Sequence, residues 1–225
     1  DRLTDRTQLL AQFDNFRREV DSAGMMGAMD RFTQQAVGIL TSGELSDALD
    51  FSKEDPRVLD RYKLLATSGQ PNYTSEGPES TNKFLLARRL LDAGVRCVSL
   101  SISDFDTHSD NFPRMKHVLP IVDHGLATLI TDLEERGQLD DTMIVVWGEF
   151  GRTPRIDPKS GGRHHWPQVG PALLAGGRLR AGQIIGATDR TASVVTSRPV
   201  SYKDVFATIY HHLGIDPHRT ALIDP

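Results

Sequence analysis

Apolar residues recur at helical spacing through the first third of the chain. Between Thr4 and Val20, leucine, phenylalanine and valine recur three and four residues apart, which predicts an amphipathic helix. A second helix is expected from Met25 to about Leu40, and Pro56 predicts the start of a short helix that ends near Leu65. The segment from Thr67 to Ser80 is rich in Ser, Gly and Pro and predicts a loop. We therefore expect a helical N-terminal region, residues 1–80, that ends in this loop.

After the loop, predicted helices alternate with short apolar strands. The helices are expected at 82–93, at 111–136 and at 201–213, where Ser201 is the expected cap and Gly214 follows the end. Buried strands are expected at VRCVSLSI (95–102) and TMIVVW (142–147), and further strands within PALLAGG (171–177) and GQIIGAT (182–188). This alternation predicts an α/β fold with three layers, in which helices flank a mostly parallel sheet. Residues 81–225 are expected to form this α/β portion, in one continuous domain with residues 1–80.

Composition and charge exclude several classes of function. The 225 residues are 38% hydrophobic and 25% charged, which is typical of a soluble globular protein with a sizeable core. The 26 basic and 30 acidic residues are spread along the chain, so no basic patch indicates a nucleic-acid partner. No apolar segment approaches the roughly 18 residues that span a bilayer. The single Cys97 excludes a disulfide framework and a Cys-rich zinc site, and its apolar neighbours predict a buried thiol.

Polar side chains capable of metal binding follow the two predicted buried strands. Ligands bind beyond the carboxyl ends of strands in open α/β sheets, so these side chains are expected at one edge of the sheet. Carboxylate oxygen and imidazole nitrogen are ligands for zinc, manganese or iron, and these metals polarise phosphoryl or sulfuryl oxygens. The first strand is followed by Asp104, Asp106 and His108, the second by Glu149 and Arg152, and the loop beyond it carries Arg163, His164 and His165.

A purely structural interpretation of the same residues stays open. The segment DFDTHSDN (104–111) can form an Asx-rich turn before the next helix, with His108 and His165 hydrogen-bonded near the surface. Arg152 and Arg163 each follow a glycine and can approach a tetrahedral oxyanion with two parallel hydrogen bonds. Arg152 can instead pair with Glu149 or a nearby aspartate and only hold the loop. The residue types alone do not choose between these interpretations.

Several motifs in order resemble the bacterial family known as domain of unknown function 1501. The resemblance is carried by EDPRVLDRY, FDTHSDNF, GEFGRTP, GRHHWP and RPVSYKDVFATIYHHLGIDP, and it extends over nearly the whole chain. That family is similar to sulfatases and, more broadly, to the alkaline phosphatase superfamily. The resemblance implies an alkaline phosphatase/sulfatase-like fold and a metal-dependent hydrolase of phosphate or sulfate esters. The implied metal is divalent, zinc first, with manganese and calcium as alternatives, and the implied substrate is a small-molecule or saccharide ester.

The resemblance also implies roles for individual residues. Glu149-Phe150 stands where the superfamily often has Asp-His, which removes one nitrogen ligand from a two-metal site. The family usually has aspartate in the place of His164, which makes His165 the better candidate of that pair. The implied metal ligands are Asp106, His108, Glu149 and His165, with Asp104 and His164 as further candidates, and the implied oxyanion contacts are Arg152 and Arg163.

The superfamily's nucleophile and first metal carboxylate have no counterpart in this sequence. By the resemblance, we expect a C-terminal portion of a longer, exported precursor, extracytoplasmic or periplasmic, with no leader in this chain. The alternative is a non-catalytic extracytoplasmic binding or scaffold protein that keeps the fold. The nucleophile and the oligomeric state stay unassigned.

Overall fold

The computed structural model describes residues 33–34, 37–38, 43–68 and 74–219. The chain divides into two compact units: residues 1–54 with 89–98, and residues 55–88 with 99–225. The helix predicted from Thr4 to Val20 lies outside the described residues, as does most of the helix predicted from Met25 to Leu40. Among the described residues, no helix combines the length and apolar character needed to cross a bilayer.

The first unit is organised around the buried side chain of Arg89. It contains α3 (Gly43–Leu49), η1 (Phe51–Lys53) and the last residues of α5 (Asn82–Asp92). The Arg89 guanidinium donates to the carbonyl oxygens of Ala48 at 2.8 Å and Asp50 at 2.9 Å, and to the Glu54 carboxylate at 2.6 Å. A cation is favourable here because the last carbonyls of a helix have no partner within it.

The thiol of Cys97, which was expected to be buried, is exposed in this first unit. The prediction of a buried thiol is wrong because it depended on the apolar neighbours of Cys97, and the segment 95–102 that contains them forms no strand.

Four predicted helices of the second unit are confirmed, two of them with identifiable caps. Asp55 accepts the backbone N–H of Arg57 at the start of α4 (Pro56–Tyr62), where Pro56 occupies a position that needs no N–H. Ser201 and Asp204 form a capping box at the start of α7 (Tyr202–His212). The other confirmed helices are α5 and α6 (Asn111–Glu135), and the short 3-10 helices are η3 (Pro78–Thr81) and η4 (Leu139–Asp141).

The core of the second unit lies where α4 and α5 pack against α6. Its fully buried side chains include Tyr62, Leu85, Val118, Ile121 and Leu133. The helices α5 and α6 approach closely at Gly125, where an added Cβ would lie 2.3 Å from a ring carbon of Phe84.

A group of buried charges also lies in this core, around Asp132 of α6. Its carboxylate accepts the Tyr62 hydroxyl at 3.0 Å and pairs with Arg88 at 3.2 Å and Arg136 at 2.9 Å. The pKa of Tyr62 is raised, first by burial and then by the Asp132 charge. Both oxygens of the Asp132 carboxylate therefore have a partner within the core, so this group belongs to the scaffold.

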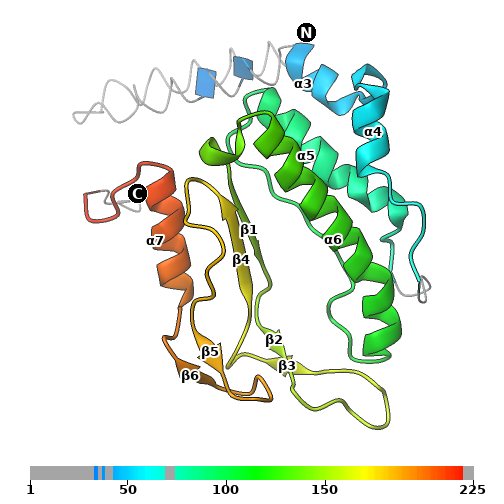
Figure 1. Ribbon diagram of the computed structural model, residues 1–225, viewed down its shortest axis with the longest axis vertical. Helices are drawn as coiled ribbons and strands as arrows, with labels where there is room; N and C mark the ends of the chain where they lie inside the picture. Colours follow the sequence, from blue (N-terminus) through cyan, green and yellow to red (C-terminus); the bar gives the residue numbers. More distant parts are fainter. Residues whose placement is uncertain (1–32, 35–36, 39–42, 69–73, 220–225) are drawn as a thin grey trace, which may run out of the picture. The chain divides into compact units, whose positions relative to one another are not determined.

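The predicted three-layer, mostly parallel sheet is wrong. Every strand pair in the described residues is antiparallel and two-stranded, as Figure 1 shows for β1 and β4. Strand β1 (Met143–Trp147) pairs with β4 (Ala172–Gly176), and β2 (Gly151–Arg152) pairs with β3 (His165–Trp166). The third pair is β5 (Ala187–Thr188) with β6 (Val195–Ser197). A parallel pair needs a crossover, usually a helix, and residues 148–171 contain no helix, so the chain returns antiparallel.

The apolar runs that suggested further sheet strands were misleading. Residues 95–102 form no strand, and Leu100 is exposed. In GQIIGAT only Ala187–Thr188 is a strand, while Ile184 is 97% exposed. A short apolar run shows only that the segment lacks polar residues. It does not identify the strand with which the segment would pair.

Candidate metal site

The candidate site is built by two loops of the second unit. One is the segment before α6, which carries Asp104, Asp106 and His108. The other is the connection between β2 and β3, a short antiparallel pair in which Arg152 lies opposite His165. Because that register sets Arg152 beside His165, the hairpin presents a guanidinium and an imidazole together.

Backbone hydrogen bonds hold these two loops against each other. The N–H of Asp110 donates to the carbonyl of Ser160 and that of Asn111 to Gly161, both at 3.0 Å, while the N–H of Arg163 donates to Thr107 at 2.7 Å. The loops touch so closely that a Cβ on Gly162 would lie 2.1 Å from the carbonyl carbon of His108. Only glycine allows this approach. Gly162 therefore lets the segment that carries His164 and His165 lie against the segment that carries His108.

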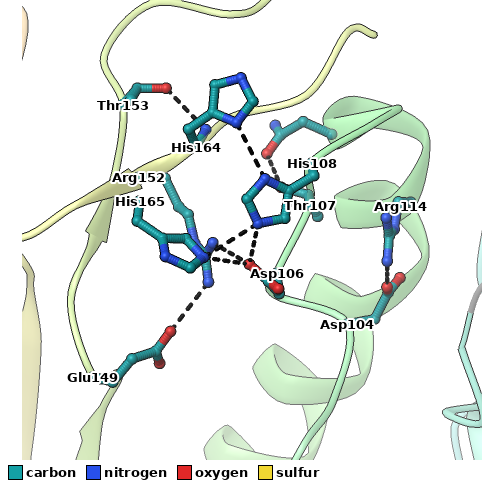
Figure 2. Close-up of polar contacts among 11 residues, drawn as sticks. Asp104, Asp106, Thr107, His108, Arg114, Glu149, Arg152, Thr153, His164 and His165 are labelled. Atoms are coloured by element: carbon teal, nitrogen blue, oxygen red, sulfur yellow. Dashed lines mark hydrogen bonds and ion pairs between the residues drawn. The ribbon is translucent and has the colours of Figure 1, made fainter.

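Three ligand-type atoms converge where the loops meet. The Nε2 atoms of His108 and His165 lie 3.2 Å apart, and each lies 3.0 Å from the same oxygen, Oδ1 of Asp106. Figure 2 shows the three side chains pointing at one spot from the two loops. We call these three residues the Asp-His-His cluster. All three are exposed, so a solute can reach them.

This arrangement fits a divalent metal. In a tetrahedral zinc site, bonds of about 2.0–2.2 Å place neighbouring ligand atoms about 3.4 Å apart. The cluster's three separations of 3.0 to 3.2 Å differ from that spacing by only a few tenths of an ångström. Two imidazole nitrogens and one carboxylate oxygen are also a donor set that zinc accepts.

The charge on Asp106 is stabilised by its neighbours. Contacts from His165 and then Arg152 hold the pKa of Asp106 below its usual range. The carboxylate is therefore ionised at neutral pH, which is the form that binds a metal.

Arg152 links the Asp-His-His cluster to Glu149. Its guanidinium donates to Asp106 and, at 3.1 Å, to Glu149. It also lies over the ring of Phe150, whose own ring contacts that of His165 with 4.5 Å between centroids. Phe150, the residue that removes a nitrogen ligand from the expected pattern, therefore packs against His165 and restricts its orientation.

The structure places three other candidate residues outside the cluster. Asp104 is in an ion pair with Arg114, and its backbone has a positive φ of 73°. The Arg163 guanidinium donates to the carbonyl of Thr153 at 3.3 Å. His164 contacts His108 through the opposite ring nitrogen, at 3.1 Å between the two Nδ1 atoms. The expected roles of Asp104, Arg163 and Glu149 remain predictions.

Sequence reasoning missed two residues that support the cluster. Asp157 accepts the backbone N–H groups of Lys159 and Ser160 and contacts His164 Nε2 at 3.4 Å. Gly162 makes the close contact with His108 described above. The Asp-Pro and Ser-Gly dipeptides of IDPKSGG were a turn signal that indicated an Asx turn at Asp157.

A surface hollow lies beside Glu149, the residue that Arg152 connects to the Asp-His-His cluster. Its volume is about 520 Å³, and its lining includes Leu100, Ile102, Trp147, Glu149, Tyr202 and Phe206. The Trp147 ring meets those of Tyr202 and Phe206 edge-on, each with 5.4 Å between centroids. The Tyr202 hydroxyl donates to the carbonyl of Gly148 at 3.0 Å, which fixes one wall.

Fold and site together define a mixed helical protein with short antiparallel strand pairs and an exposed group of one aspartate and two histidines. The family model described as "Protein of unknown function (DUF1501)" matches residues 1–222, so the chain belongs to this family. No curated protein and no solved structure matches the chain significantly.

Proposed function

We propose that this chain carries the metal-binding part of a hydrolase that cleaves phosphate or sulfate esters. The observation that carries the proposal is the convergence of the Asp-His-His cluster on one point, at 3.0 to 3.2 Å between ligand atoms. One carboxylate oxygen can accept both imidazole N–H groups, but that would direct two protons at the same point from nitrogens only 3.2 Å apart. A metal cation accounts for this arrangement, because it can accept a lone pair from each of the three ligand atoms.

The Asp-His-His cluster, Arg152 and Glu149 have different roles in the expected chemistry. Asp106, His108 and His165 would hold the divalent ion, zinc first, with manganese and calcium as alternatives. When bound, such an ion activates water and polarises the oxygen of a phosphoryl or sulfuryl group. Arg152 supplies a fixed guanidinium beside the same aspartate and can bind the anionic group with two hydrogen bonds. Glu149, on the far side of Arg152, is a further candidate ligand.

The substrate class follows from the charge of the site and from the hollow beside it. Arg152 selects for an anion, and the hollow lined by Trp147, Tyr202 and Phe206 suits the organic part of a small-molecule or saccharide ester. The order of the carboxylate and histidine motifs supports a relation to sulfatases and the alkaline phosphatase superfamily. The proposal depends on the ligand geometry and not on a parallel sheet. An extracytoplasmic location of the whole protein is part of the same proposal.

Elemental analysis of protein dialysed after zinc loading tests the metal site. Wild type is expected to retain zinc, and His108→Ala and His165→Ala are expected to lose it. His211→Ala is the matched control, because His211 is an exposed histidine on α7 that is not part of the cluster. Equal zinc content in all four proteins would refute the metal site.

Turnover of aryl phosphate and aryl sulfate esters with zinc, manganese or calcium tests the proposed hydrolase activity.

The ion pairs of Arg152 with Asp106 and Glu149 favour a second candidate, a non-catalytic binding or scaffold protein, because they hold the loop without any reaction. Bound zinc without turnover of either ester, in this chain and in any longer form that contains it, would favour that second candidate.

A further inference from the structure

We infer that His164 and Asp157 are positioning residues for the metal ligand His108, and that His164 is not itself a ligand. The inference rests on the proposed metal site. Its observation is a chain of contacts that leads away from the cluster: His108 Nδ1 to His164 Nδ1 at 3.1 Å, then His164 Nε2 to Asp157 Oδ2 at 3.4 Å.

His164 lies on the wrong side of the His108 ring to share its metal. The cluster faces His108 Nε2, where Asp106 and His165 converge, whereas His164 faces Nδ1 across the ring. Figure 2 shows His164 and His165 on opposite sides of the His108 ring. The two nitrogens of an imidazole direct their lone pairs away from each other, so one ion cannot bind His108 Nε2 and His164 Nδ1 together.

Proton placement then follows from the chemistry of neutral imidazole. A histidine that binds a metal through Nε2 carries its proton on Nδ1. His108 must therefore donate from Nδ1, and His164 must offer a lone pair at its own Nδ1. His164 then carries its proton on Nε2, where the Asp157 carboxylate accepts it. Each contact requires the next, so Asp157 selects the tautomer that lets His108 bind.

The backbone holds this chain of contacts in place. The N–H of His164 donates to the Thr153 hydroxyl at 3.1 Å, and its carbonyl accepts the N–H of Thr153 at 2.9 Å. Oδ1 of Asp157 caps its own turn through Lys159 and Ser160, which leaves Oδ2 for His164. The hydrogen-bond partner of a metal-ligating histidine fixes the orientation of its ring and increases its basicity.

Paired substitutions at His164 separate positioning from ligation. The carbonyl oxygen of asparagine is as many bonds from Cα as Nδ1 of histidine, so His164→Asn keeps an acceptor for His108. We expect zinc affinity, measured by competition with a chelator, to fall about 10- to 100-fold in His164→Ala and to be largely restored in His164→Asn. Equal losses in both variants would overturn the inference, because an acceptor for His108 would then not be what His164 supplies.

Asp157→Asn tests the tautomer directly. The remaining amide oxygen can still cap the turn, while the amide N–H₂ faces His164 Nε2 and opposes a proton there. Zinc affinity is expected to fall about 10-fold or more. Asp189→Asn is the control, since Asp189 caps a similar turn through Ser193 and Val194. In zinc-loaded wild type, ¹⁵N-correlated NMR is expected to show His164 as the neutral Nε2–H tautomer, with neither nitrogen shifted by the metal.

The outcomes distinguish this inference from the proposed function. Wild type that binds no zinc would overturn the metal site and the positioning roles with it. Wild type and Asp157→Asn that bind zinc equally would overturn only the positioning roles. Circular dichroism of each variant identifies a loss of folding, and the His164→Asn rescue decides the matter if Asp157→Asn does not fold.

Discussion

Two arginine–aspartate contacts of the second unit are alike in chemistry and differ in exposure. The Arg88–Asp132 pair lies between α5 and α6 with both side chains almost fully buried, at 4% and 3% exposure. The Arg152–Asp106 pair joins strand β2 to the segment before α6, with Asp106 62% exposed. The first aspartate is surrounded by donors that match its acceptors, whereas the second is approached by two imidazole nitrogens as well.

Exposure decides which of these charges stabilise the fold and which are available for chemistry. A buried charge must be fully paired, because leaving one partner alone in the core is costly. An exposed pair contributes little to stability, so its arrangement is free to serve binding. We therefore expect substitutions around Asp132 to change the free energy of unfolding and substitutions around Asp106 to change metal binding.

The largest expected effect is that of Arg88→Ala. Removing this side chain leaves Asp132 buried with one cation fewer, and we expect a loss of about 3 to 5 kcal/mol in urea unfolding. Arg61→Ala is the matched control, because Arg61 pairs with Glu135 of the same helix α6 at an exposed position. That variant is expected to lose less than about 1 kcal/mol. Similar losses in the two variants would show that burial of the Arg88–Asp132 pair adds nothing to its contribution to stability.

A slightly smaller effect is expected from Glu76, a second buried carboxylate. Burial alone would raise the pKa of Glu76, but hydrogen bonds from Lys83 and Ser103 lower it to about 2. Since the pKa is lowered in the folded state, this stabilisation is present above about pH 4.5 and is lost as the pH falls towards 2. The amount is on the order of 3 kcal/mol, because one pKa unit corresponds to about 1.4 kcal/mol.

Urea unfolding at pH 5 and pH 2.5 measures this acid dependence. Glu76→Gln is expected to show a smaller drop in stability between the two values than wild type. Asp106→Asn is expected to follow wild type closely, because the charge on exposed Asp106 is screened by solvent. If stability depended less on pH in Asp106→Asn than in wild type, and not in Glu76→Gln, then Asp106 and not Glu76 would be the carboxylate that stabilises the fold.

The third effect separates binding from folding in the Asp-His-His cluster. Zinc at one hundred times its dissociation constant is expected to stabilise wild type by about 2.7 kcal/mol. In His108→Ala this zinc-dependent gain is expected to vanish, while stability in zinc-free buffer changes by less than about 0.5 kcal/mol. Thermal unfolding with and without zinc measures both quantities. A large loss of stability in the absence of zinc would instead place His108 in the scaffold.

The helices of the second unit were predictable because their signals are local. Asp55 with Pro56, and Ser201 with Asp204, satisfy the first N–H groups of their helices through residues adjacent in sequence. The sheet was not predictable in the same way. The pairing of β1 with β4 depends on the path of the 24 residues that connect them. The apolar run TMIVVW predicts a strand but does not identify the strand that pairs with it.

The candidate site was predictable in part. Asp106, His108 and His165 were identified by type and order, and the structure brings them together. Phe150 and Asp157 were not identified as supports, because the contacts of their side chains with His165 and His164 depend on how the β2–β3 hairpin folds. The ligand types are visible in the chain, whereas the residues that orient them depend on tertiary contacts.

The smallest expected effect, from Arg152→Ala, is the sharpest test of the comparison with Arg88. Both arginines contact an aspartate, but the partners of Arg152 are exposed, so its loss is expected to cost less than about 1 kcal/mol of stability. Zinc content is expected to persist, because Arg152 contributes no ligand atom and its removal frees Asp106 Oδ1. Affinity for inorganic phosphate, measured by calorimetry on the zinc-loaded protein, is expected to fall about 10-fold with the loss of a charged hydrogen bond. A loss of stability as large as that of Arg88→Ala, with phosphate affinity unchanged, would show that Arg152 only holds the loop.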